Sequence, residues 1–298
     1  MKNPVDLQAS LVFKSEASLG EGAIWHAEEQ KLYWVDIEGK KLCVYDPSDG
    51  TNKEFNVGSM LGTVVPVQSG GAVIAMQSGI QQIDTKSGEL TWLLNALPDT
   101  VNVRYNDGKC DPSGRLWVGT FRIDGQKEAA VLWRIDKDTS VHLILDKVGI
   151  SNGIVWTKDK KKMYYADTPT GLIQAFDYDD QTGNISNRSV AVTIPKESGE
   201  PDGMTIDEND NLWVALWGSG TVCQYNSKTG ELMQRITVPA PNVTSCAFGG
   251  KDLDILYITT AANYLTPEQA KDNPLSGSLF SVKPGVKGVT ASYYKQGL

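Results

Sequence analysis

The sequence predicts an all-β protein folded as a six-bladed β-propeller, because one short apolar run recurs six times along its 298 residues. The copies are LYWVD, AVIAM, LWVGT, MYYAD, LWVAL and LYITT, which start at residues 32, 72, 116, 163, 212 and 256. Successive copies therefore start 40, 44, 47, 49 and 44 residues apart. A period in the forties made of short β-rich runs is typical of propeller blades, each a sheet of four strands.

A second strand-like run follows each copy and ends in a turn, as in KLCVYDPSDG (41–50) and GIQQIDTKSG (79–88). An Asp or Asn closes most of these runs, and in most of them a Gly follows a few residues later. A short acid can cap its own turn, and Gly accepts the positive φ that turns require. We therefore interpret four acids as turn caps rather than metal ligands: Asp46, Asp84, Asp136 and Asp177.

The remaining segments fit the same architecture. A strand-like stretch at 7–15 precedes the first unit, and we expect it to complete the last blade, since an open ring would leave an exposed sheet edge. The segment TPEQAKDN (266–273) predicts a short helix with Thr266 as N-cap and Glu268 in its first turn. Because the repeat runs almost end to end, we expect residues 1–298 to form one propeller domain.

Composition narrows the range of partners and metal sites that the protein can have. The net charge is −8 and no basic run is visible, which disfavours nucleic acid or an anionic membrane as a partner. No apolar stretch is long enough to span a bilayer, and the N-terminus lacks a signal-peptide core, so we expect a cytoplasmic protein, a monomer or weak homo-oligomer. Only two histidines occur, which excludes a His-rich zinc site. Four cysteines without CxxC spacing predict buried, reduced thiols: Cys43, Cys110, Cys223 and Cys246.

Three polar residues occupy matched positions ahead of the repeated runs. Glu21 and Asn152 each lie 11 residues before a run and Asp202 lies 10 before, and Gly follows each of them. The innermost strand of a blade should begin there, so these side chains should point into the central channel. Two carboxylates and an amide on one axis favour a hard divalent cation. The alternative is that each X-Gly pair is only a tight turn into its strand.

Further polar groups surround this set. Arg104 and Asn106 are two residues apart on the same expected strand and so share a face toward the ligand space. A guanidinium there suits a polyol or a carboxylate, although a surface Arg paired with an acid is the alternative. The loops 121–130 and 263–277 are candidate rims, with Arg122 or Asp124 reaching inward.

Five stretches together resemble the regucalcin, gluconolactonase and luciferin-regenerating enzyme family. They begin at residues 19, 104, 150, 201 and 243: LGEGAIWHAEEQKLYWVDIEGKKL, RYNDGKCDPSGRLWVGT, ISNGIVWTKDKKKMYYADT, PDGMTIDENDNLWVA and VTSCAFGGKDLDILYITTA. The resemblance covers nearly the whole chain and implies a six-bladed propeller with one divalent metal on its central axis. It implies calcium foremost, with zinc, magnesium or manganese as alternatives.

The resemblance also implies roles for single residues. It makes Glu21, Asn152 and Asp202 the metal ligands and Arg104 and Asn106 substrate contacts. Asp124 falls where the family often has a substrate-contacting Glu, but in a loop of different sequence. This shorter acid suggests a substrate preference that differs from the animal aldonolactonases.

The function expected from these residues is that of a metal-dependent lactonase opening sugar-type lactones. The metal would polarise the carbonyl, and Asp202 is the candidate general base. One alternative is a phosphoesterase or aryl-lactone hydrolase on the same fold, although such sites call for more carboxylates. The other is a non-catalytic calcium-binding regulatory protein.

Overall fold

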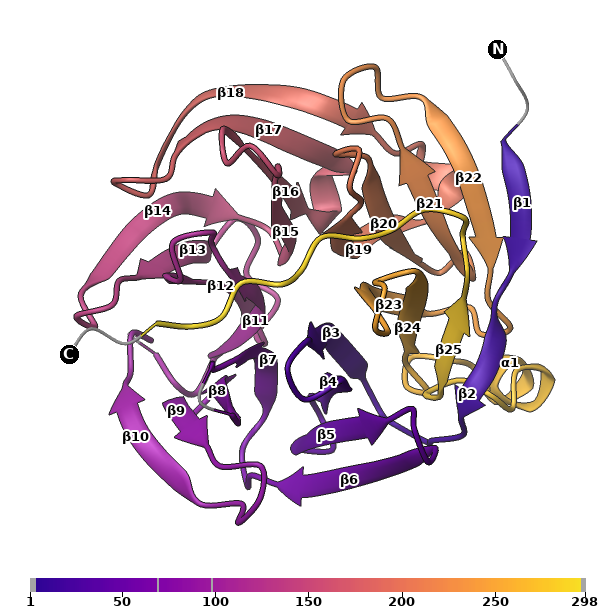
Figure 1. Ribbon diagram of the computed structural model, residues 1–298, viewed down its shortest axis with the longest axis horizontal. Coiled ribbons are helices and arrows are strands. Elements are labelled where there is room, and N and C mark those ends of the chain that lie inside the picture. Colours follow the sequence, from indigo (N-terminus) through magenta and orange to yellow (C-terminus); the bar gives the residue numbers. More distant parts are fainter. Residues whose placement is uncertain (1–3, 69, 98, 296–298) are drawn as a thin grey trace.

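The computed structural model describes residues 4–68, 70–97 and 99–295, and in these ranges six sheets stand around a central axis (Figure 1). The six repeated runs form the second strand of each sheet, as predicted. Their apolar side chains alternate between the two faces of a blade and pack against the neighbouring blades, which accounts for their near-complete burial. The prediction of an all-β, six-bladed propeller is confirmed.

Each blade has four antiparallel strands ordered outward from the axis, and the sheet of blade 5 has a fifth strand besides. Blades 1 and 2 comprise β3 (Gly20–His26), β4 (Lys31–Asp36), β5 (Lys41–Asp46), β6 (Thr51–Asn56), β7 (Leu61–Pro66), β8 (Ala72–Met76), β9 (Gly79–Ile83) and β10 (Leu90–Leu94). Blades 3 and 4 comprise β11 (Val103–Cys110), β12 (Leu116–Arg122), β13 (Ala130–Ile135), β14 (Val141–Val148), β15 (Ser151–Trp156), β16 (Lys162–Asp167), β17 (Leu172–Asp179) and β18 (Asn184–Thr193). Blades 5 and 6 comprise β19 (Glu200–Ile206), β20 (Leu212–Trp217), β21 (Thr221–Tyr225), β22 (Leu232–Thr237), β23 (Val243–Gly249), β24 (Ile255–Thr260) and β25 (Leu279–Val282), to which the N-terminal segment adds.

The N-terminal segment closes the ring, as predicted. Strand β2 (Ser10–Phe13) pairs antiparallel with β25 and completes the last blade. The segment is divided, however, because β1 (Val5–Gln8) pairs parallel with β22 as a fifth strand of blade 5. The small, buried Ala9 lies between them and donates its N–H to the carbonyl of Thr237 at 2.9 Å. One short stretch therefore ties two blades together.

The predicted helix is also present, as α1 (Pro267–Asp272). The Thr266 hydroxyl accepts the N–H of Gln269 at 3.2 Å, and the Gln269 side chain accepts the N–H of Thr266 at 2.9 Å. Two short 3-10 turns are found besides, at Thr168–Thr170 and Lys196–Ser198. None of the described helices has the length and apolarity needed to cross a membrane.

Turn capping by the four acids is confirmed for two of them. Asp46 accepts the N–H of Ser48, and Asp84 accepts the N–H groups of the two residues that follow Thr85. For Asp136 and Asp177 the prediction is wrong. Strand β17 continues to Asp179, which caps the turn there, and Asp138 does so in blade 3, so the earlier acids are left to pair with Arg134 and Lys162.

Two buried acids in blades 3 and 5 serve the core. Asp111 and Asp207 are both fully buried, and each accepts the indole N–H of a tryptophan six residues later at 3.0 Å. Each also accepts backbone N–H groups of its own turn. These carboxylates are fully supplied with donors and have no free oxygen for a ligand. The four cysteines are buried and free, as expected.

Candidate functional site

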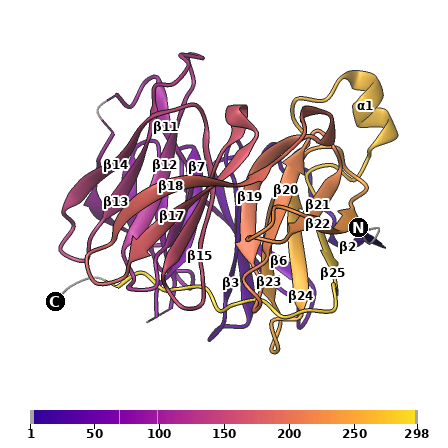
Figure 2. The same ribbon diagram turned by 90° about the horizontal axis from the view of Figure 1, so that it is seen from above.

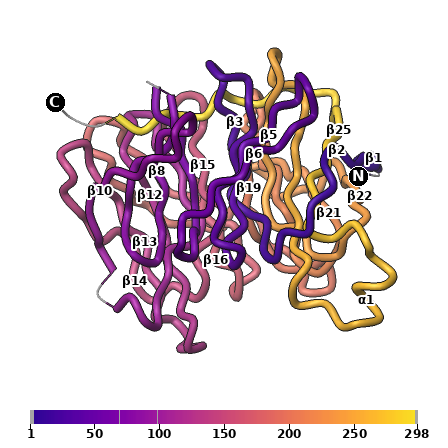
Figure 3. Tube along the Cα trace, turned by 90° about the horizontal axis from the view of Figure 1, so that it is seen from below, coloured from indigo at the N-terminus to yellow at the C-terminus, as the bar shows by residue number. Residues whose placement is uncertain are grey.

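The first strands of the six blades line the channel and run from one face of the ring to the other. Helix α1 lies on the face where these strands begin, which we call the upper face (Figure 2). The C-terminal segment after β25 crosses the opposite, lower face (Figure 3). Glu21, Asn152 and Asp202 stand near the starts of β3, β15 and β19, so all three belong to the upper half of the channel.

A β-bulge places these side chains. Every first strand shifts register against its second strand at the same point, for instance between Glu21 and Ile24 and between Pro201 and Met204. A bulge bends the strand and turns a side chain away from the regular alternation. The interpretation of X-Gly as a turn ahead of the strand is therefore wrong, because these residues lie within the strands themselves.

The glycines of the X-Gly pairs support the site in different ways. Gly22 donates its N–H to Glu21 at 2.9 Å, which fixes the carboxylate in place. Gly153 allows the inner strands to approach closely, because a Cβ there would lie 2.8 Å from the carbonyl oxygen of Asp202. The residue after Asn152 therefore packs directly on the backbone of Asp202.

The three predicted ligands are buried, at 6 %, 5 % and 6 % exposure for Glu21, Asn152 and Asp202. The carboxyl groups of Glu21 and Asp202 lie close enough for each to act on the pKa of the other, so the channel brings together acids 181 positions apart in the sequence. Burial raises the pKa of Glu21 well above its usual value, and the charges of Asp202 and Asp107 raise it further. Burial and the charge of Asp107 likewise raise the pKa of Asp202.

Asn152 joins this pair through hydrogen bonds. Its Oδ1 accepts from Asn106 Nδ2 at 2.9 Å, and its Nδ2 donates to Thr168 Oγ1 at 2.8 Å. Thr168 in turn donates to the carbonyl of Pro201, beside Asp202, at 2.7 Å. Both amide orientations are thereby fixed, with the oxygen of Asn152 on the side of Asn106.

Arg104 extends the same network. Its Nη1 donates to Asn106 Oδ1 at 2.5 Å and to the Tyr105 carbonyl at 3.0 Å, and its guanidinium lies 4.6 Å from the centre of the Phe121 ring. The side chain is 8 % exposed, so it is not a surface arginine. Burial lowers its pKa, while the charge of Glu21 raises it, which places the cation in the field of the acids.

Asp124 lies apart from this buried group. It is exposed on the loop after β12 and accepts Arg122 Nε at 3.0 Å and the N–H of Gln126 at 3.2 Å. The Arg122 guanidinium holds the pKa of Asp124 below its usual range. The two candidate rim residues therefore pair with each other in this structure.

Sequence reasoning missed a third channel carboxylate, Asp107. It is 5 % exposed, its Oδ1 accepts the N–H of Gly108 at 2.7 Å, and its Oδ2 has no hydrogen-bond partner. Its pKa is raised by burial. The sequence does contain a signal for this residue, because Asp107 precedes a Gly as Glu21 and Asp202 do, but only the adjacent Asn106 was assigned to the site.

The rim also contains Glu38, which sequence reasoning missed, and Tyr264, which lies in the predicted rim 263–277 but was not singled out. Tyr264 donates its hydroxyl to Glu38 Oε1 at 2.5 Å and meets Trp217 edge to face, with ring centroids 5.8 Å apart. Together with Trp217 these residues come from three blades, and the charge of Glu38 acts on Arg104. Glu38 lies in a loop outside the repeated pattern, so no sequence signal marked it.

The donor set fits a hard divalent cation. Asp202 Oδ1 and Asp107 Oδ2 are buried oxygens without a partner, and neighbouring buried carboxylates repel unless a proton or a cation lies between them. Among the described residues no group of three or more His, Cys, Asp or Glu side chains is arranged for a metal ion. A cation here would therefore depend on the amide oxygen of Asn152 as well as on Glu21 and Asp202.

Comparison with known proteins agrees with this architecture. Residues 19–262 match the SMP-30/Gluconolactonase/LRE-like region. The chain is 38 % identical over 277 residues to the "Putative sugar lactone lactonase YvrE" of Bacillus subtilis, covering 93 % of this chain and 95 % of the relative. It is 36 % identical to the regucalcin of Danio rerio, covering 97 % and 98 %.

Solved structures resemble it closely as well. A luciferin-regenerating enzyme superposes with a TM-score of 0.87 at 32 % identity, covering 96 % of this chain and 100 % of the other. A calcium-binding protein, regucalcin, from Agrobacterium tumefaciens superposes with a TM-score of 0.91 at 26 % identity, covering 99 % of both. With its repeated blades and its matched residues, the chain belongs to the SMP-30/gluconolactonase/LRE-like family.

Proposed function

We propose that this protein is a metal-dependent lactonase that opens sugar-type lactones. The observation that carries the proposal is the pair of buried carboxyls, Glu21 and Asp202, in contact at the upper end of the channel, with Asp202 Oδ1 unpartnered. A buried guanidinium and two amides lie on the same end. The relative whose name is "Putative sugar lactone lactonase YvrE" supports the substrate class.

The residues would divide the work as follows. Glu21, Asn152 and Asp202 would hold the cation, calcium foremost, with zinc, magnesium or manganese as alternatives. When bound, such an ion supplies Lewis-acid polarisation of the lactone carbonyl. Asp202 would act as general base through its free Oδ1 and take a proton from the attacking water.

Asp202 would both accept the proton of the attacking water and return it to the leaving oxygen. The hydroxide oxygen bonds to the carbonyl carbon, the ring C–O bond breaks, and the ring oxygen leaves as an alcohol with the proton that Asp202 returns. The product is an open-chain hydroxy acid, which ionises in neutral water. No other reactant is needed.

Arg104 and Asn106 would orient the substrate. The guanidinium is held by Asn106 Oδ1 and by the Phe121 ring, and its remaining N–H groups can donate to sugar hydroxyls. A site built to hydrogen-bond hydroxyls rejects analogues that lack them, because its own buried groups would be left unpaired. Asp124 would contact the substrate only after leaving Arg122.

A substrate screen tests this function. Metal-stripped protein is supplied with calcium, zinc, magnesium or manganese in turn and assayed on aldonolactones, aryl lactones and phosphoesters, with chelator controls. We expect turnover of aldonolactones that depends on the added cation. Turnover of phosphoesters alone, or cation binding without turnover of any ester, would contradict the proposal and favour one of the two alternatives.

Two variants make the test specific. Asp202→Asn keeps the shape of the side chain and removes the base, so we expect turnover to fall by about two orders of magnitude or more. Asp252→Asn, in an exposed turn of blade 6, is the matched control and should leave turnover unchanged. Equal rates for Asp202→Asn and the wild type would remove Asp202 from the mechanism.

A further inference from the structure

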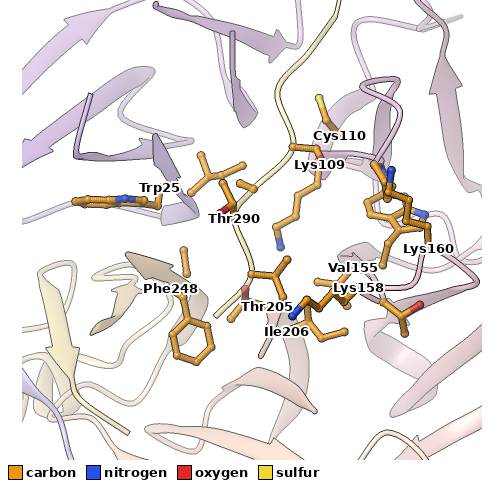
Figure 4. A pocket seen from close by; sticks show the side chains of 18 of the residues that line it. Trp25, Lys109, Cys110, Val155, Lys158, Lys160, Thr205, Ile206, Phe248 and Thr290 are labelled. Carbon is orange, nitrogen blue, oxygen red and sulfur yellow. The ribbon is translucent and has the colours of Figure 1, made fainter. Parts of the chain in front are cut away.

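The lower end of the channel contains a cavity of about 240 Å³. The ends of the first strands of five blades line it, and the segment 289–292 runs across it (Figure 4). Trp25 lies four residues beyond Glu21 on β3, which corresponds to about 13 Å along a strand. The cavity is therefore separate from the candidate lactone site at the upper end.

The walls of this cavity are mainly apolar, with side chains such as Val155, Ile206 and Phe248. A body of hydrocarbon would gain free energy by leaving water for such walls. An engineered protein cavity of about 150 Å³ holds a benzene molecule, so this volume suits one ring or a short chain. A sugar, with hydroxyls on every carbon, would leave most of its hydrogen bonds unmade there.

All the ionisable side chains with a charge at neutral pH that line the cavity are lysines, namely Lys109, Lys158 and Lys160, in a protein of net charge −8. The ammonium of Lys109 extends toward the centre of the cavity (Figure 4). It donates one hydrogen bond, to the carbonyl of Met204, and interacts electrostatically with Asp107 on the same strand. Lys160 is partly neutralised by Asp180 at 3.3 Å, and Lys158 is exposed at the opening.

We propose that this cavity is a second binding site, for a small organic anion that combines one carboxylate with an aromatic or short aliphatic body. The carboxylate would accept from Lys109, which has two further N–H donors, and the body would lie against Val155, Thr205 and Phe248. The positive charge of Lys109 favours a carboxylate, and the apolar walls favour a hydrocarbon body. Neither observation depends on the lactonase proposal.

Binding to the full-length, metal-loaded protein tests the inference by calorimetry. The probes are octanoate, octylamine and octanol, which share one chain and differ in charge. We expect octanoate to bind at least tenfold more tightly than octylamine. Equal affinity for the two, or no octanoate binding at millimolar concentration, would overturn the proposal.

Variants locate the bound anion. Lys109→Met keeps the length of the side chain and removes the charge, and should weaken octanoate binding about tenfold or more. Arg104→Ala removes the cation of the upper site and should leave octanoate binding unchanged, as should Lys251→Met in an exposed turn of the lower face. Loss of binding in Arg104→Ala with retention in Lys109→Met would place the anion in the upper site and refute the inference.

A second substitution keeps the test decisive if Lys109→Met does not fold, which circular dichroism would reveal. Thr205→Phe enters the cavity from another wall and should exclude octanoate by volume alone (Figure 4). Octanoate affinity in a folded Thr205→Phe equal to that of the wild type would overturn the proposal. Dimerisation through this face, seen by sedimentation and accompanied by no octanoate binding, would overturn it as well.

Discussion

The pairing of Glu21 with Asp202 predicts that one substitution stabilises the metal-free protein while it destroys the site. In the absence of a cation, two buried carboxyls compete for protons next to a third, Asp107. Asp202→Asn removes one of them and supplies an amide N–H that can donate to Glu21. An uncompensated buried charge destabilises the folded state. We therefore expect the free energy of unfolding of the metal-free variant at pH 8 to be about 1–4 kcal/mol higher than that of the wild type.

The dependence on pH follows from the raised pKa values. In the unfolded chain these carboxyls ionise near pH 4, whereas in the folded protein they keep a proton to higher pH. In that interval these two carboxyls bind more protons in the folded state than in the unfolded state, so their contribution to metal-free stability falls as pH rises above about 4. The fall should be shallower in Asp202→Asn, which has one carboxyl fewer.

Urea unfolding at pH 5 and pH 8, with chelator and with calcium, measures both effects. In a chain of this size 1 kcal/mol corresponds to about 2 °C in Tm, so thermal melts would show the variant about 2–8 °C above the wild type at pH 8 in chelator. Calcium should stabilise the wild type more at pH 8 than at pH 5, and the variant little at either pH. A metal-free variant no more stable than the wild type at pH 8 would refute the reasoning.

Asp207→Asn is the matched contrast, since Asp207 is equally buried but supplied with donors from Trp213, Gln224 and two backbone N–H groups. The amide of an asparagine at this position would direct one of its N–H groups toward a neighbouring group that is itself a donor. We expect a loss of about 1–3 kcal/mol, the same with and without calcium. Opposite signs for the two Asp→Asn changes would separate a carboxylate built for a cation from one built into the core.

Further predictions concern the rim and the ring closure. Arg104→Lys keeps the charge but loses the planar fork, so KM for an aldonolactone should rise about tenfold or more with a smaller change in kcat, and an unchanged KM would remove Arg104 from substrate binding. Tyr264→Phe removes the hydroxyl bonded to Glu38 and should alter the preference between aldonolactones while leaving Tm within about 2 °C, which steady-state assays and melts would show. Deleting residues 1–13 removes β1 and β2 and should lower Tm by about 10 °C or more, because the pairings of both strands are lost, and an unchanged Tm would contradict their role in closing the ring.

The sequence predicted the ring because each repeated apolar run marks the same strand of its blade. A residue that stands 10 or 11 places before each apolar run must lie on the first strand, whatever the loops do, so Glu21, Asn152 and Asp202 could be assigned to the channel. A different argument, that an open ring would leave an exposed sheet edge, placed the N-terminal strand at the last blade. The repeat failed to predict the roles of Asp136 and Asp177, because the lengths of outer strands vary between blades.

Position along a strand does not give the direction of a side chain, and here the bulge decides it. Register shifts are not visible in a pattern of apolar residues, so the contact between Glu21 and Asp202 and the place of Asp107 beside them needed the structure. At the rim, the sequence marked the loop of Tyr264 but not its partner Glu38. Their hydrogen bond joins residues 226 positions apart, and the loop of Glu38 carries no repeated feature.

All six first strands have the bulge, yet only some of them carry an acid or an amide at it. Blades 2 and 6 have the smaller Gly62 with Thr63, and Thr244 with Ser245, at the same point. The bulge is therefore a property of closing the ring, and the site arises where the sequence departs from small residues at a position that the fold has already turned toward the axis. Because a bulge leaves the outer pairing of the blade intact, an acid or amide at this point can add chemistry to the channel without changing how the outer strands pair.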